Sequence, residues 1–116
     1  MLQIRFRLLI SVLFLIHFSQ ISLAQNKTLS NLEITTLLHD AKLNRINGLY
    51  EESLLKSRVA LEQSIKSKRN DLIANSYLII ASNFDELTEP LKALHYYNLG
   101  LHYANKTNNF TLKNQF

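Results

Sequence analysis

The residues best suited to metal binding or proton transfer are three histidines, His39, His95 and His102. On a helix, His95 and His102 would share one face at a spacing of seven. Two helical turns would separate them by about 10 Å, which is too far for both to bind one metal ion. We therefore predict no metal site and assign these histidines to the surface or to half-buried positions.

Two pairs of adjacent acidic residues could act in general acid–base catalysis, Glu51 with Glu52 and Asp85 with Glu86. Adjacent side chains on a helix point about 100° apart, so neither pair would converge on one substrate. The sequence has no cysteine, only two glycines, and no HExxH, GxSxG or phosphate-binding glycine loop. We predict no catalytic residues, no cofactor and no enzymatic activity for this chain.

Tyr96, Tyr97 and Tyr103 could stack on nucleobases if a basic surface accompanied them. The formal net charge is +4, but Arg5 and Arg7 belong to a segment that we expect to be removed. Without them, the 13 basic residues fall to 11 against nine acidic ones, a net charge of +2. We therefore assign the tyrosines to packing between helical hairpins and expect no nucleic acid partner for this segment.

Residues 1–24 have the pattern of a secretory signal peptide. Arg5 and Arg7 precede an apolar run over residues 8–18, and a small residue, Ala24, marks the expected cleavage site. The run is short for a membrane span of about 20 residues. We predict an exported protein, periplasmic or extracellular after cleavage. The alternative is an uncleaved signal that anchors the chain in the inner membrane.

An internal repeat organises the remaining residues. Two sets of small residues share a spacing of twelve and then seven and lie forty residues apart: Ala41, Ser53 and Ala60, then Ala81, Ala93 and Gly100. Repetition at such a period is typical of a solenoid, in which each helical hairpin stacks on the next to bury its apolar face.

Capping residues define the first helix of this repeat. Ser30 followed by Glu33 forms a capping box, which predicts a helix that begins at Asn31. Asn47 and Gly48 are expected to end it, because glycine enters a left-handed turn without steric cost.

Three further helices follow, over residues 50–66, 71–87 and 90–105. Thr88 is the expected N-cap of the last of these, and Thr111 the N-cap of a fifth helix. In the second helix, we expect apolar contacts from Leu54, Leu55, Val59, Leu61 and Ile65.

The hairpins resemble tetratricopeptide repeats, whose signature is a set of small residues where paired helices touch. The matching residues are Ala41, Gly48, Tyr50, Ser53, Ala60 and Leu61 in the first copy, and Tyr77, Ala81, Phe84, Ala93, Tyr97, Gly100 and Leu101 in the second. The chain departs from the family at Asn44, which replaces an aromatic residue, at Thr88, which replaces the turn glycine, and in the absence of a closing proline. Its period of forty also exceeds the usual length of about 34 residues.

The resemblance implies an all-α fold of antiparallel helical hairpins stacked as a short α-solenoid. A plain four-helix bundle is the alternative, since alanines are also common at its helix contacts. The expected organisation is a signal peptide over 1–24, a polar lead-in over 25–30, hairpins over 31–70 and 71–110, and the start of a third repeat over 111–116. We expect this sequence to be the front of a longer protein, because Leu112 continues the register of Leu72.

For function, the resemblance implies a scaffold whose inner helices present a concave surface to a protein or peptide partner. Carried over by register, the candidate positions are Thr35, Leu38, Lys42, Arg45, Asn75, Leu78, Ser82 and Asp85. Lys42 and Arg45 lie three apart on one helix face, so they could pair with a ligand carboxylate or remain solvated.

The alternative function is the periplasmic sensor region of a two-component signalling protein. The chain is similar to the N-terminal parts of Bacteroidota sensor histidine kinases and helix-turn-helix regulators, whose effector would lie beyond residue 116. Membrane contact is expected only through an uncleaved signal or a missing downstream span. Because Leu94 and Leu101 would lack a cover, we expect the isolated chain to be marginally stable or to self-associate.

Overall fold

The computed structural model describes residues 28–116, so the predicted signal peptide lies outside the described residues. Residues 28–116 form helices and turns with no strand. The helices are α2 (Asn31–Ile46), α3 (Tyr50–Lys66), α4 (Asn70–Glu86), α5 (Pro90–Ala104) and α6 (Phe110–Lys113). The predicted all-α class with stacked antiparallel hairpins is therefore confirmed.

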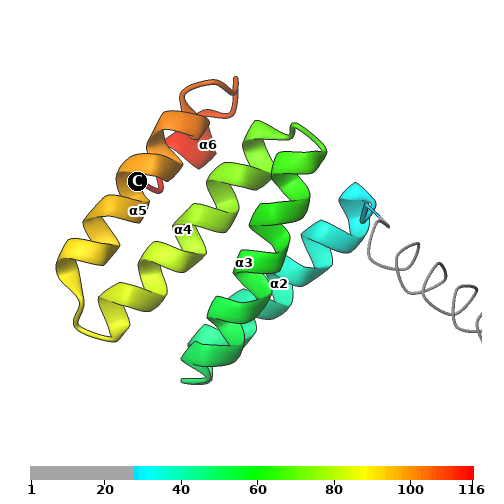
Figure 1. The fold of residues 1–116 in the computed structure, drawn as a ribbon. Helices are drawn as coiled ribbons and strands as arrows, with labels where there is room; N and C mark the ends of the chain where they lie inside the picture. Colours follow the sequence, from blue (N-terminus) through cyan, green and yellow to red (C-terminus); the bar gives the residue numbers. More distant parts are fainter. Residues whose placement is uncertain (1–27) are drawn as a thin grey trace, which may run out of the picture.

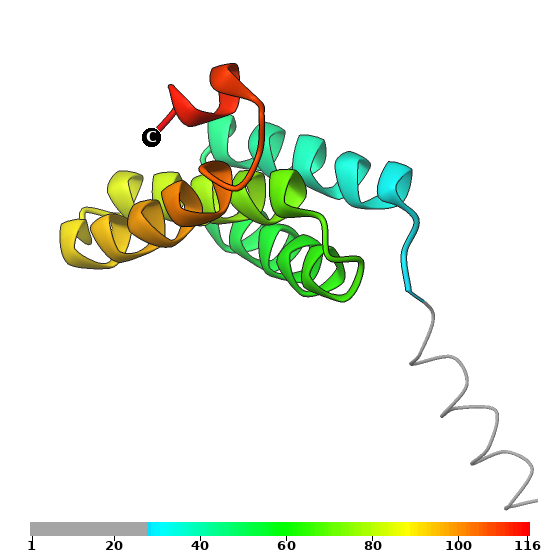
Figure 2. The ribbon, with the colours of Figure 1, turned by 90° about the horizontal axis from the view of Figure 1, so that it is seen from above.

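Helix α4 is the central element of the described part. It packs against its hairpin partner α5 and against α3, and it also contacts α2 and α6. Figure 1 shows α4 between α3 and α5. In the view from above, α2 and α6 lie on one side of α4 and α3 lies on the other (Figure 2). The first helix of each hairpin thus faces a common inner side, as in a solenoid.

The predicted ends of α2 agree with the structure. The backbone N–H of Glu33 donates to Ser30 Oγ at 3.3 Å, and the N–H of Ser30 donates to Glu33 Oε2 at 2.8 Å, which completes the capping box. At the other end, Gly48 has φ +75°, the left-handed conformation expected of it.

The prediction that Thr88 caps α5 is wrong. Thr88 has φ 57° and closes α4, while Glu89 is the N-cap of α5. The N–H groups of Thr88 and Glu89 donate to the carbonyls of Asp85 and Phe84 at 3.0 and 2.8 Å. Gly48 and the residue after it make the same pair of bonds forty residues earlier, so Thr88 occupies the position of the turn glycine.

The N-cap of α6 was also predicted wrongly. Asn109, rather than Thr111, caps this helix, because its Oδ1 accepts a hydrogen bond from the N–H of Leu112 at 3.0 Å. Asparagine is one of the strongest N-cap residues, and here it stands two positions earlier than the threonine. Leu112 is buried as expected from its register with Leu72.

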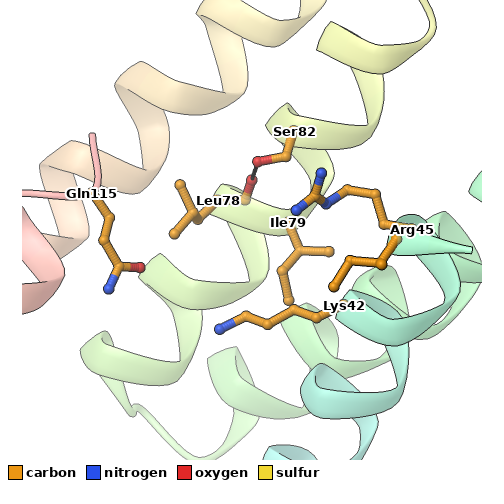
Figure 3. Close-up of a pocket in the computed structure, with 7 residues that line it drawn as sticks. Lys42, Arg45, Leu78, Ile79, Ser82 and Gln115 are labelled. Carbon is orange, nitrogen blue, oxygen red and sulfur yellow. Dashed lines mark hydrogen bonds between the residues drawn. The ribbon is translucent and has the colours of Figure 1, made fainter.

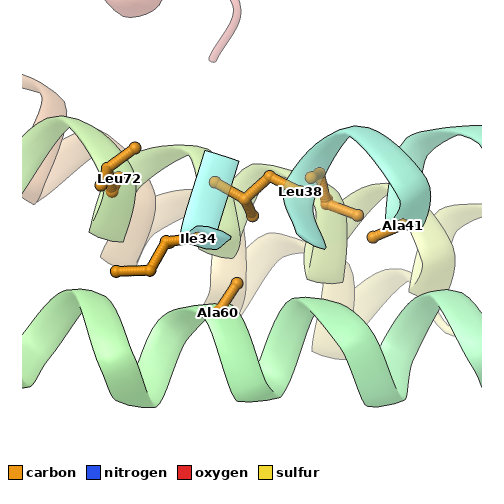
Figure 4. Packing of buried hydrophobic residues seen from close by; sticks show 6 residues of the cluster. Ile34, Leu38, Ala41, Ala60 and Leu72 are labelled. Carbon is orange, nitrogen blue, oxygen red and sulfur yellow. The ribbon is translucent and has the colours of Figure 1, made fainter. Parts of the chain in front are cut away.

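The core between α2, α3 and α4 consists of aliphatic and small side chains: Ile34, Leu38, Ala41, Ala60, Leu72 and Ile79. Figure 4 shows the methyl group of Ala60 pointing from α3 toward α2. A second cluster of Ile80, Phe84 and Ala93 joins the two hairpins, with Leu54 and Leu61 of α3 packed against it. These contacts fix the position of α4 relative to α2.

The predicted core face of α3 is only partly right. Leu55 and Ile65 are 65% and 49% exposed, and Val59 is exposed as well. The buried residues of α3 are instead Ser53, Ser57, Ala60 and Ser64. Their small side chains allow neighbouring helices to approach closely, and a serine hydroxyl can be buried when it donates to a backbone carbonyl of its own helix. Ser57 and Ser64 do so at 2.8 and 2.6 Å.

A buried chain of hydrogen bonds crosses from α2 to α4. Ser53 Oγ donates to the carbonyl of Ala41 at 2.7 Å and accepts from Asn83 Nδ2 at 2.8 Å. The same Nδ2 donates to the carbonyl of Ile79 at 2.9 Å. Asn83 Oδ1 is buried without a hydrogen-bond partner among residues 28–116. Asn83 therefore links the two hairpins through its amide nitrogen alone.

Candidate functional site

A pocket of about 220 Å³ lies on the inner side of the fold, between α2 and α4. Its lining residues come from three segments: Lys42, Arg45 and Ile46 of α2, Leu78, Ile79 and Ser82 of α4, and Gln115 after α6. Figure 3 shows Ile79 between the side chains of Arg45 and Lys42, with Gln115 on the far side beside Leu78. Lys42, Arg45, Leu78 and Ser82, four of the predicted positions, thus line one pocket.

Helical spacing explains how these side chains meet. Lys42 and Arg45 are three residues apart and project from the same face of α2. Leu78 and Ser82 are four residues apart on α4, which brings them onto the face opposite those cations. The floor of the pocket belongs to α4, which contacts α2, α3, α5 and α6.

The two cations of the pocket differ in their surroundings. Arg45 Nη1 forms an ion pair with Glu86 Oε1 at 3.2 Å, and both side chains are partly exposed. Lys42 forms no side-chain hydrogen bond or ion pair with any other described residue. The pocket therefore combines one satisfied cation with one that remains available to a ligand, above an apolar floor.

A network of hydroxyl groups borders the pocket next to Ser82. Tyr97 Oη donates to Asp85 Oδ2 at 2.8 Å and lies 3.5 Å from Ser82 Oγ. Burial raises the pKa of the Tyr97 hydroxyl, and its bond to the Asp85 carboxylate raises it further. Tyr97 consequently stays protonated at neutral pH and acts here as a hydrogen-bond donor that ties α5 to α4.

The other four predicted positions do not line this pocket. Leu38 is 5% exposed and belongs to the core. Thr35 Oγ1 donates to the carbonyl of Asn31, and Asn75 Nδ2 donates to the carbonyl of Asp71, so both side chains bond to their own helices. The fourth position, Asp85, is engaged by Tyr97 as described above.

Three lining residues were missed by the sequence analysis: Ile46, Ile79 and Gln115. Gln115 could have been found, because it lies forty residues after Asn75, which was itself a candidate position. Ile46 follows Arg45 in sequence, and Ile79 follows Leu78. Adjacent residues of a helix point about 100° apart, so the repeat register did not predict these two as lining residues.

Across residues 28–116, no three histidine or acidic side chains lie close enough together to hold a metal ion. Within that same range, none of the helices combines the length and the apolar character needed to cross a membrane.

Comparisons with protein-family models, with curated proteins and with solved structures found no match. The site must therefore be interpreted from its own geometry.

Proposed function

We propose that this chain is an exported scaffold of the tetratricopeptide-repeat kind, without catalytic activity of its own, that binds a peptide or a peptide-like segment of a protein. The observation that carries the proposal is the pocket between α2 and α4, where an unpaired cation stands above an apolar floor. Its position on the inner side of stacked hairpins is where a solenoid offers an extended binding surface.

The dimensions of the pocket favour one anchoring side chain of a peptide. Pockets for whole small molecules usually enclose about 300 to 1,000 Å³, and this one encloses about 220 Å³. Leu78 would contact an apolar side chain of the ligand. Lys42 would pair with a nearby ligand carboxylate, and Arg45 would join it by exchanging its present partner, Glu86.

The proposal is tested by selecting peptides from a displayed random library and titrating them against the protein by calorimetry. Selected peptides should carry an acidic group next to an apolar residue. Lys42→Glu should weaken their binding by at least about tenfold. A charge-assisted hydrogen bond contributes about 1.5 to 3 kcal/mol, and the introduced glutamate would also repel the carboxylate of the peptide.

A matched control is Arg58→Glu, which makes the same change of charge at an exposed position of α3 outside the pocket. This variant should bind the selected peptides as the wild type does. Equal affinity of the wild type and Lys42→Glu would refute the pocket as the recognition site. An equal loss in both variants would show that the peptides respond only to net charge.

A further inference from the structure

The C-terminal residues meet the second hairpin at Gly100 in α5. A Cβ atom built on Gly100 would lie 2.6 Å from Cζ of Phe116 and 3.1 Å from Cβ of Tyr77. The ring of Phe116 therefore fills space that the side chain of any other residue at position 100 would need. The same ring packs edge-on against Tyr97, with the ring centroids 6.5 Å apart.

The repeat shows that this arrangement is particular to the second hairpin. The equivalent positions forty residues earlier hold Ala60 and Ser76, two small residues that are both fully buried. Forty residues later, glycine stands in place of the alanine at position 100 and phenylalanine in place of the serine at position 116. Gly100, which has no side chain, leaves space beside α5 for the ring of Phe116.

Residues 110–116 depend on such side-chain anchors. Leu112 is 2% exposed and packs with Ala74 and Ala104, and Phe116 packs against the same cluster. Phe110, at the start of α6, is 76% exposed and provides no comparable anchor. Loss of Phe116 docking should therefore loosen the neighbouring Gln115, while Leu112 still anchors α6.

The anchored segment also forms part of the pocket. Gln115 precedes Phe116 and lines the pocket beside Leu78 (Figure 3). We propose that the docking of Phe116 on Gly100 holds Gln115 in place as one wall of the inner pocket. The inference rests on the proposed function for the role of the pocket, but its structural content can be tested without any peptide.

The absence of cysteine from the sequence permits a direct test. Leu78→Cys places a single thiol on the pocket floor, where the native side chain is 9% exposed. In this background, Phe116→Ala should increase the rate of alkylation by iodoacetamide several-fold, because Gln115 no longer shields the floor. Gly100→Ala should have the same effect, although alanine is otherwise the better helix residue. Phe110→Ala is the matched control and should leave the rate unchanged.

A second reporter separates opening of the wall from general loosening of the fold. Ser57→Cys places the thiol in α3 at a position that is 0% exposed. Faster alkylation at position 78 with an unchanged rate at position 57 supports the proposal. Equal acceleration at both positions, or no acceleration at either, overturns it. Since no peptide is present in the assay, these outcomes do not depend on whether the pocket binds one.

Discussion

Replacing Asn83 by aspartate should destabilise the protein more than replacing it by alanine, although aspartate nearly matches the native shape. Asn83 Nδ2 donates to Ser53 Oγ at 2.8 Å and to the carbonyl of Ile79 at 2.9 Å. A carboxylate has no hydrogen to donate, so both bonds would be lost. Ser53 cannot compensate, because its own hydroxyl hydrogen is donated to the carbonyl of Ala41.

The magnitude follows from the burial of Asn83, which is 0% exposed. An unpaired buried charge costs about 3 to 5 kcal/mol, so we expect Asn83→Asp to lower the free energy of unfolding by about that amount near neutral pH. Asn83→Ala loses the same two bonds without introducing a charge and also removes the unsatisfied Oδ1. Its cost should be about 1 to 3 kcal/mol.

The two variants should also differ in their dependence on pH. Burial raises the pKa of the introduced carboxyl group above its unfolded value of about 3.9. The folded state then binds more protons than the unfolded state, so the stability of Asn83→Asp falls as the pH rises from about 4 through the folded pKa. In its protonated form the group can donate one hydrogen bond. Asn83→Ala should show no such dependence beyond that of the wild type.

Urea unfolding followed by far-ultraviolet circular dichroism, at about pH 4 and about pH 7, measures both effects. The difference between the two variants should be large at neutral pH and small at acidic pH. Equal destabilisation by both substitutions at both pH values would refute the reasoning, since it would mean that water reaches position 83 in the folded protein.

Three further predictions concern stability and association. Thr88→Gly should raise the free energy of unfolding by about 1 kcal/mol. A left-handed backbone costs a non-glycine residue about 1 to 2 kcal/mol, and the greater conformational entropy of glycine in the unfolded state offsets part of this stabilisation. A lower urea midpoint would contradict this prediction. The hydrogen bond from Arg69 lowers the pKa of the Asp71 carboxyl group, so its stabilising effect is present above about pH 4 and is lost as the pH falls through the folded pKa. Acid unfolding of the wild type and Asp71→Asn should therefore differ above about pH 4 and converge as the pH falls through the folded pKa, whereas parallel curves would argue against the effect. Leu94 is 57% exposed, so Leu94→Glu should reduce self-association measured by light scattering; a wild type that is monomeric at high concentration would contradict the prediction.

The helix ends that could be predicted are those whose hydrogen bonds are local in sequence. The capping box of Ser30 and Glu33 and the left-handed Gly48 each depend on residues within one turn, so their types identify the helix ends directly. Thr88 was assigned wrongly because threonine is common at N-caps and rare in the left-handed conformation. Only the register with Gly48 indicates that the turn requires that conformation.

The core of α3 could not be read from hydrophobic periodicity. Ser53, Ser57 and Ser64 count as polar in such a pattern, yet each is buried and donates its hydroxyl hydrogen to a backbone carbonyl. Close approach of helices, rather than apolar area, determines which residues are buried there. For the same reason Leu55 was assigned to the core, although its side chain is 65% exposed.

At the pocket, the repeat register predicted residues near the C-terminal ends of α2 and α4. Lys42 and Ser82 were found in this way, and Gln115 follows from the same register once it is extended by one period. Leu38 and Leu78 occupy equivalent positions, but the former is buried in the core and the latter forms the pocket floor. This difference arises from packing between helices that are distant in sequence. The repeat register describes positions along the chain and therefore does not predict such packing.

The most direct test of the recognition site is a two-dimensional ¹H–¹⁵N NMR titration of the protein with a selected peptide. The account predicts that the largest amide shift changes lie around Lys42 on α2 and around Leu78 and Ser82 on α4. Changes centred instead on the exposed face of α3, around Leu55 and Arg58, with the pocket amides unchanged, would contradict it.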